Sequence, residues 1–191
     1  MKASIVGLFA RRLGLETLKG IVEENTFEIK ALVTHYYEPD MKTVRPLFKE
    51  FVKISEKYAI PFIIVHKNQK NLKILNNIEY DFLVSNCYKY KIPEKYLKLA
   101  KIASLNMHRS LLPRYKGLKP LKKALENGEK KTGTTIHIMT PKIDSGEIID
   151  QYEIKIEKDD TEQSLFNKLY PTQYPLLKRA LIKIIDKYEK R

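Results

Sequence analysis

The strongest constraint on the fold is a regular alternation of short apolar segments with longer amphipathic ones over the first half of the chain. The short segments are typical of buried strands, and the longer ones repeat their apolar residues at helical spacing. Strands that alternate with helices predict a parallel sheet with helices on both faces. We expect strands at residues 2–9, 27–33, 60–65 and 82–85, and helices at 11–24, 41–58 and 67–77.

The second half of the chain continues this pattern. Strands are expected at 101–107, 132–139 and 147–156, and helices at 118–127, 161–170 and 172–189. A chain of 191 residues is large enough for one good hydrophobic core. We therefore predict an α/β fold in a single domain over residues 1–191: a doubly wound, mostly parallel twisted sheet of about seven strands with helices on both faces.

Composition narrows the class of protein. Hydrophobic residues make up 43% and charged residues 31%, as in soluble globular proteins. No apolar run approaches the ~20 residues that span a bilayer, and residues 1–9 read as a first strand rather than a signal peptide. The single cysteine, Cys87, suits a reducing compartment. We expect a cytoplasmic protein with no membrane partner.

The net charge of +13 raises the question of a nucleic-acid partner. The lysines are spread along nearly every segment and often stand near a glutamate, as in residues 93–99. This distribution is typical of a solvated surface, so we do not expect nucleic acid to be the partner. An attraction for anionic small molecules is consistent with the charge. The sequence leaves open whether the chain forms a homodimer.

The candidate catalytic residues stand at the end of the predicted strand 101–107. Asn106 and His108 are two residues apart, so their side chains leave the same face of the strand. Ligands of open α/β sheets bind outside the carboxyl ends of the strands. An amide N–H can stabilise a developing oxyanion, and an imidazole can donate a hydrogen bond or take a proton. The loop after strand 132–139 supplies a carboxylate, Asp144.

Four motifs in a fixed order carry a resemblance to a known family. They are Asn-x-His-x-Ser-Leu-Leu-Pro-x-x-x-Gly at 106–117, Asn-Gly at 127–128, Thr-Gly-Thr-Thr at 132–135 and Ile-Asp-x-Gly at 143–146. Together they resemble the folate-dependent formyltransferases, which act on glycinamide ribonucleotide, methionyl-tRNA or nucleotide-sugar amines. The resemblance implies the formyltransferase fold and transfer of a formyl group from 10-formyltetrahydrofolate to a primary amine of a small molecule.

The resemblance also implies roles for individual residues. Asn106 and His108 would stabilise the oxyanion, while Asp144 would either pair with a cationic His108 or accept the amine proton through a water molecule. No metal is needed, and the four histidines do not stand at zinc-ligand spacing with Cys or Glu. The folate donor would be held by Tyr88, Lys89, Tyr90, Lys91, Ile92, Ser110, Leu111, Leu112, Pro113, Thr140, Pro141, Lys142 and Ile143.

The acceptor site is the least determined part. The first turn carries Gly7 but no Gly-x-Gly-x-x-Gly fingerprint, and it departs from the Gly/Ser/Asn-rich phosphate loop of glycinamide ribonucleotide enzymes. Arg11 and Arg12 either hold a phosphate instead or are exposed first-turn residues. Gly117 is assigned to the acceptor, and His137 is either a wall of that site or a core histidine.

Chain length favours a glycinamide-ribonucleotide-type acceptor, that is, a phosphorylated small molecule, and the first turn argues against it. A nucleotide-sugar amine is the main alternative. A tRNA acceptor would make use of the positive charge, but the sequence shows no counterpart of the second domain that methionyl-tRNA formyltransferases share. The non-enzymatic alternative is a basic RNA-binding module on the same fold.

Overall fold

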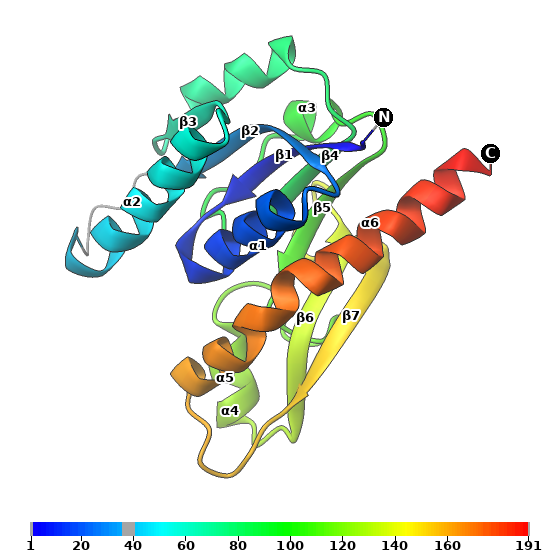
Figure 1. Cartoon of the computed structure of the whole chain (residues 1–191). Coiled ribbons are helices and arrows are strands. Elements are labelled where there is room, and N and C mark those ends of the chain that lie inside the picture. The colour runs from blue at the N-terminus through cyan, green and yellow to red at the C-terminus, as the bar shows by residue number, and fades with distance from the viewer. Residues whose placement is uncertain (1, 36–40, 191) are drawn as a thin grey trace. The chain divides into compact units, whose positions relative to one another are not determined.

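The computed structural model describes residues 2–35 and 41–190, with side chains from residue 46 onward in the second stretch (Figure 1). The chain divides into two compact units. The N-terminal unit comprises residues 1–104 and the C-terminal unit residues 105–191. The single domain expected over residues 1–191 stays a prediction.

The N-terminal unit consists of alternating strands and helices, as the sequence predicts. Strand β1 pairs in parallel with β2 and β4, and β2 pairs in parallel with β3. The crossover segments are the helices between these strands. The elements are β1 (Ser4–Phe9), α1 (Arg11–Glu24), β2 (Glu28–His35), α2 (Met41–Lys57), β3 (Phe62–Val65), the 3₁₀ helix η1 (Lys70–Asn77), β4 (Phe82–Asn86) and α3 (Glu94–Leu97).

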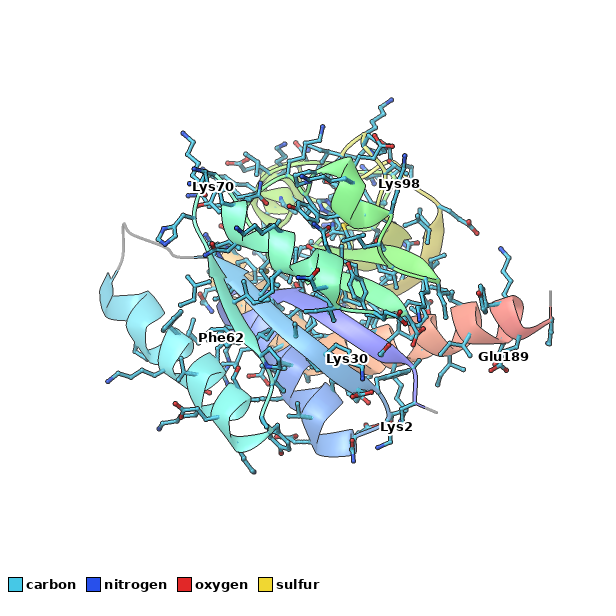
Figure 2. All side chains as sticks on the ribbon, turned by 90° about the horizontal axis from the view of Figure 1, so that it is seen from above. Lys2, Lys30, Phe62, Lys70, Lys98 and Glu189 are labelled. Atoms are coloured by element: carbon cyan, nitrogen blue, oxygen red, sulfur yellow. The ribbon has the colours of Figure 1, made fainter. Side chains whose placement is uncertain are left out.

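Helices cover both faces of this parallel sheet. Figure 2, seen from above, shows α1 and α2 on one side of β1 and β2, and η1 and α3 on the other. Every residue of β1 and β4 is buried, as expected for strands of a sheet that has helices on both faces. Helix α1 turns an apolar stripe of Leu13, Leu15, Leu18 and Ile21 into this core.

The C-terminal unit is built differently. Its elements are β5 (Ala103–His108, which begins at the boundary), α4 (Pro120–Glu126), β6 (Lys131–Ile138), β7 (Ile148–Lys155), α5 (Glu162–Leu169), the 3₁₀ turn η2 (Tyr170–Thr172) and α6 (Gln173–Glu189). The pairings β5–β6 and β6–β7 are antiparallel. The loop 139–147 between β6 and β7 contains no helix, and a parallel connection needs a dozen or more residues. The antiparallel pairing of β6 with β7 therefore follows from the short connection between them.

The described strands have the order β3-β2-β1-β4-β5-β6-β7 in a seven-stranded sheet. The predicted α/β class with a mostly parallel sheet of about seven strands is confirmed. Within the C-terminal unit, α6 packs against β6 and β7, and its buried residues include Leu176, Leu177, Ala180 and Leu181. These are the apolar positions that the helical spacing predicts.

Two negative findings hold for residues 2–35 and 41–190. No helix in this part of the chain has the length and apolar character to cross a membrane. No three His, Cys, Asp or Glu residues there are grouped so that they could bind a metal ion.

Candidate active site

The pairing of β5 with β6 brings the polar residues of two motifs onto one face of the sheet. Asn106 lies opposite His137, and His108 lies opposite Thr135. Residues directly opposite each other in an antiparallel pair are close enough for their side chains to touch. His108 and His137 are buried, and Asn106 is half-buried.

Asp144 completes this cluster from the loop 139–147. Its Oδ2 lies 3.3 Å from His108 Nδ1 and accepts a 2.8 Å hydrogen bond from the Gly117 N–H. Its Oδ1 lies 3.4 Å from His137 Nε2 and 3.4 Å from Asn106 Nδ2. The three predicted catalytic residues and His137 therefore converge within the C-terminal unit.

The loop that carries Asp144 is held in shape by its own residues. Asp144 has a left-handed backbone with φ of 49°. Thr140 Oγ1 donates to the Lys142 carbonyl at 2.8 Å, and Ser145 Oγ donates to the Ile143 carbonyl at 2.9 Å. At Gly146 an added Cβ would lie 1.9 Å from the Ile138 carbonyl oxygen, so only glycine fits there. Contacts within the loop thus set the orientation of the Asp144 carboxylate.

The proton positions on His108 follow from its partners. Its Nε2 lies 2.9 Å from the Tyr115 carbonyl oxygen. Because a carbonyl only accepts, Nε2 carries the proton in the neutral ring. Nδ1 then faces Asp144, where a second proton would complete an ion pair.

Burial decides the charge states of this pair. Burial lowers the pKa of His108, and the Asp144 carboxylate and the Tyr115 carbonyl offset this only in part. For Asp144, burial raises the pKa, but contact with His137, the neighbouring His108 and the Gly117 N–H outweigh it, so the pKa lies below its usual value. Near neutral pH the resting pair is an ionised Asp144 beside a neutral His108.

The amide of Asn106 has a different environment from the one expected. Its Nδ2 lies 3.2 Å from His137 Nε2 and 3.4 Å from Asp144 Oδ1. An amide nitrogen has two N–H bonds, and both face protein acceptors in this arrangement. The N–H groups that we expected to serve an oxyanion are therefore already engaged.

Two residues that the sequence reasoning missed support the segment 110–113. Thr135 Oγ1 donates to the Ser110 carbonyl at 2.6 Å and accepts from the Leu112 N–H at 3.0 Å. Gln151 Nε2 donates to the Leu112 carbonyl at 3.0 Å and to Thr135 Oγ1 at 2.8 Å. The side chains of Ser110 and Leu112 are buried. They anchor the segment, so any folate contact there falls to the backbone or to Leu111 and Pro113.

In the N-terminal unit, one side chain organises the loop 88–92. The amide of Gln69 accepts a 2.9 Å hydrogen bond from the Tyr88 hydroxyl and donates one of 3.0 Å to the Lys91 carbonyl. His35 lies under the same loop, with its Nδ1 3.4 Å from the Lys89 N–H. The rings of Tyr88 and Tyr90 pack edge-on against His35 at 5.7 Å. Gln69 lacked a sequence signal because its partners are 19 and 22 residues away.

We expect Gln69→Ala to raise the KM for the formyl donor about tenfold with little change in kcat. The substitution removes two hydrogen bonds, each contributing about 1 kcal/mol, from the loop 88–92 that the family resemblance assigns to the folate donor. Steady-state kinetics with Tyr88→Phe as a partial, matched change checks this. Equal KM values for the wild type and Gln69→Ala would contradict it.

Acid should destabilise the protein through His35. Burial, together with the charges of Lys89 and Arg11, lowers the pKa of His35 to about 4. In the unfolded chain His35 binds a proton near pH 6.5, whereas in the folded chain it binds one only near pH 4. The free energy of unfolding therefore decreases as the pH falls from 6.5 to about 4. This shift corresponds to about 3 kcal/mol. Urea unfolding at a series of pH values should show the loss, and His35→Phe should flatten it.

The first turn does not present Gly7 to a ligand. Gly7 is buried within β1, and an added Cβ would lie 2.5 Å from the Phe9 ring. The glycine therefore packs inside the sheet, and its assignment to the acceptor stays a prediction. Arg12 pairs with Glu16 at 2.6 Å and approaches Glu50 at 3.9 Å, and Arg11 is exposed at the first position of α1.

Two further residues that the sequence assigns to the acceptor, Gly117 and His137, contact Asp144. Gly117, with φ of 83°, uses its N–H to hold Asp144. His137 is a buried neighbour of Asn106 and Asp144, with 2% of its surface exposed. Both residues contact the catalytic cluster. By contrast, Ile143, assigned to the folate, is 60% exposed.

Lysine charges in the N-terminal unit are widely dispersed. Lys70 and Lys98 lie toward the top of Figure 2, and Lys30 and Lys2 lie lower in the same view. Lys98 pairs with Glu94 at 2.6 Å and Lys30 pairs with Glu28 at 2.7 Å. The predicted pairing of lysine with glutamate in residues 93–99 is confirmed.

The sequence pattern of the family described as formyl transferase matches residues 42–181. This chain belongs to the formyl transferase family. The motif resemblance is thus confirmed over a stretch that contains all three predicted catalytic residues.

Two curated relatives show how far the similarity extends. The methionyl-tRNA formyltransferase of Lactobacillus gasseri is 37% identical over 189 residues, covering 96% of this chain and 59% of its own length. The bifunctional polymyxin resistance protein ArnA of Wigglesworthia glossinidia brevipalpis is 42% identical over 156 residues, covering 80% of this chain and 23% of its own length. This chain therefore spans less than two thirds of either relative.

Solved structures of the formyl transferase family share the fold. Phosphoribosylglycinamide formyltransferase from Anaplasma phagocytophilum aligns with a TM-score of 0.78 and 22% identity, covering 98% of this chain and 88% of that one. The Bacillus halodurans enzyme of the same name aligns with a TM-score of 0.77 and 22% identity, covering 98% and 97%. At this identity the likeness establishes the formyltransferase fold.

Proposed function

We propose that this protein transfers a formyl group from 10-formyltetrahydrofolate to a primary amine. The convergence of Asn106, His108 and Asp144 carries the proposal, because the carboxylate lies 3.3 Å from the imidazole and 3.4 Å from the amide. The amine nitrogen forms a bond to the formyl carbon and builds negative charge on the formyl oxygen. The bond from this carbon to N10 of the folate then breaks, and the proton lost by the amine is gained by N10 of the departing tetrahydrofolate. A buried hydrogen-bond donor beside a carboxylate suits that charge.

His108 is the oxyanion donor in this proposal. Its Nε2–H already holds one oxygen acceptor, the Tyr115 carbonyl, at 2.9 Å. The formyl oxygen would take over this hydrogen bond as its charge develops. The same ring can gain a proton on Nδ1, beside Asp144, which strengthens the donor at Nε2.

Asp144 acts as the ion-pair partner of His108 rather than as a base that works through water. Each of its oxygens already has two protein nitrogens within 3.4 Å: Gly117 N and His108 Nδ1 at Oδ2, and Asn106 Nδ2 and His137 Nε2 at Oδ1. Of these nitrogens, His108 Nδ1 is the one that takes the second proton of its ring, so Asp144 is placed to pair with a cationic His108.

Methionyl-tRNA is the first acceptor to test. The Lactobacillus gasseri relative of that name matches almost the whole chain at 37% identity. This revises the preference for a glycinamide ribonucleotide acceptor that chain length alone supported.

Glycinamide ribonucleotide remains the second candidate. Structures of phosphoribosylglycinamide formyltransferases match the fold over nearly their full length. Against it, Gly7 is buried inside β1 and Arg12 is paired with Glu16. A nucleotide-linked amino sugar is the third acceptor for comparison.

The test is turnover of 10-formyltetrahydrofolate by the purified protein with each of the three amines in turn. Release of tetrahydrofolate and gain of one formyl mass on the acceptor are the expected results, with methionyl-tRNA giving the highest kcat/KM. Absence of folate turnover with all three amines, combined with salt-dependent RNA binding, would favour the non-catalytic module instead.

A further inference from the structure

His137 is a buried histidine whose two ring nitrogens both have partners. Its Nδ1 lies 2.9 Å from the Ile138 carbonyl oxygen. Its Nε2 lies 3.2 Å from Asn106 Nδ2 and 3.4 Å from Asp144 Oδ1. Because Asn106 and His137 are opposite each other in the β5–β6 pairing, the backbone register holds the two side chains together.

These partners determine the tautomer of a neutral ring. The Ile138 carbonyl can only accept, so the proton of His137 resides on Nδ1. Nε2 then offers a lone pair to the nearest donor, which is the Asn106 amide nitrogen.

The tautomer in turn determines which way the Asn106 amide faces. One N–H of Asn106 is directed at His137 Nε2 and the other at Asp144 Oδ1. The amide oxygen has no hydrogen-bond partner in the part of the chain that the structure describes. Oδ1 is therefore the atom left to meet a substrate.

We propose that His137 is a positioning residue that presents the Asn106 oxygen to the attacking amine. This inference rests on the proposed function. The Asn106 oxygen accepts an N–H of the incoming amine and orients the nitrogen lone pair toward the formyl carbon. His108 alone supplies the side-chain donor to the developing oxyanion. The site thus has separate groups for the nucleophile and for the negative charge.

The backbone behind His137 is built to keep this arrangement. The Ile138 N–H donates to the Glu147 carbonyl at 2.9 Å. The Ile138 carbonyl lies so close to Gly146 that an added Cβ would stand 1.9 Å from it. Gly146 therefore packs against the Ile138 carbonyl oxygen, which accepts the hydrogen bond from His137 Nδ1. The His137 ring in turn orients the Asn106 amide through Nε2.

The first test is the protonation state of His137, measured by long-range ¹H–¹⁵N NMR on ¹⁵N-histidine-labelled protein near neutral pH. The chain has four histidines, so His66→Gln and His108→Ala assist the assignment. We expect a protonated Nδ1 and an unprotonated Nε2. A proton on Nε2 would overturn the proposal, because the amide of Asn106 would then have to turn its N–H groups toward the substrate.

The Asn106→Asp variant tests the contact between residues 106 and 137 by replacing the amide donor with a carboxylate acceptor. A carboxylate placed 3.2 Å from His137 Nε2 offers only acceptors, so the ring should gain a proton on Nε2 in the NMR spectrum. An unprotonated Nε2 in this variant would show that the two side chains do not share a hydrogen bond. Neither NMR measurement depends on enzymatic turnover, so they stand even if the formyltransferase activity fails.

A double-mutant cycle tests the catalytic part. His137→Leu should lower kcat about tenfold, while the KM for the formyl donor changes less than about twofold. In the Asn106→Ala background, His137→Leu should cost less than about threefold, because its effect passes through Asn106. If the fold-losses in kcat of His137→Leu and Asn106→Ala multiply in the double variant, the two residues act independently and the proposal is overturned. The matched control is His66→Leu, an exposed histidine of the N-terminal unit, which should leave kcat unchanged.

Discussion

His108→Ala should lower kcat/KM for formyl transfer by about 10²–10³-fold, or about 3–4 kcal/mol of transition-state stabilisation. The substitution removes the Nε2–H that now holds the Tyr115 carbonyl at 2.9 Å. It also leaves Asp144 as a carboxylate without its imidazole partner at 3.3 Å. Steady-state kinetics with the identified amine measures the loss.

The control for this variant is His66→Ala, since His66 is exposed and belongs to the N-terminal unit. Its activity should stay within about twofold of the wild type, as for most surface changes. Thermal unfolding should show that His108→Ala is folded at the assay temperature. Near-full turnover by a folded His108→Ala protein would refute the catalytic assignment of His108.

Asp144→Asn should depress kcat about 10²-fold or more, with a much smaller effect on folate affinity. The amide keeps the shape of the side chain and removes its charge. Asp144 raises the pKa of His108 against the effect of burial, so its loss should lower that pKa further below 6.5. A ring with a lower pKa is a poorer proton carrier as the oxyanion forms.

Two measurements separate this expectation from simple loss of structure. An NMR titration of His108 should show a lower pKa in Asp144→Asn than in the wild type. Equilibrium binding of tetrahydrofolate should be nearly unchanged. An unaltered His108 titration combined with full activity would show that the carboxylate is not the partner of the imidazole.

Strand and helix positions were predictable because they depend on local periodicity. The expected helix 11–24 is α1 (Arg11–Glu24), and the expected strand 132–139 is β6 (Lys131–Ile138). The antiparallel direction of β6 and β7 was not foreseen. The β6–β7 pairing depends on the short connection between these two strands, whereas the connection from β5 to β6 contains helix α4. Strand direction leaves no mark in the apolar pattern of a strand.

The convergence of the three candidate catalytic residues was predictable for a different reason. Asn106 and His108 belong to one short motif at the end of a strand, and Asp144 belongs to a second motif in a loop. The ordered motifs made the set specific before any geometry was known. Gln69 and Gln151 belong to no such motif, and Thr135 belongs to the Thr-Gly-Thr-Thr motif without a role that the motif reveals, since each acts through partners at least 16 residues away.

By itself the sequence determined the fold class, the order of the elements and the identity of the amide, the imidazole and the carboxylate. Only the tertiary structure decided which atom of each group is available. Hydrogen-bond direction depends on what lies within about 3 Å. The Ile138 carbonyl, the Tyr115 carbonyl and the Gly117 N–H reach that range only after β5, β6 and their loops have packed together.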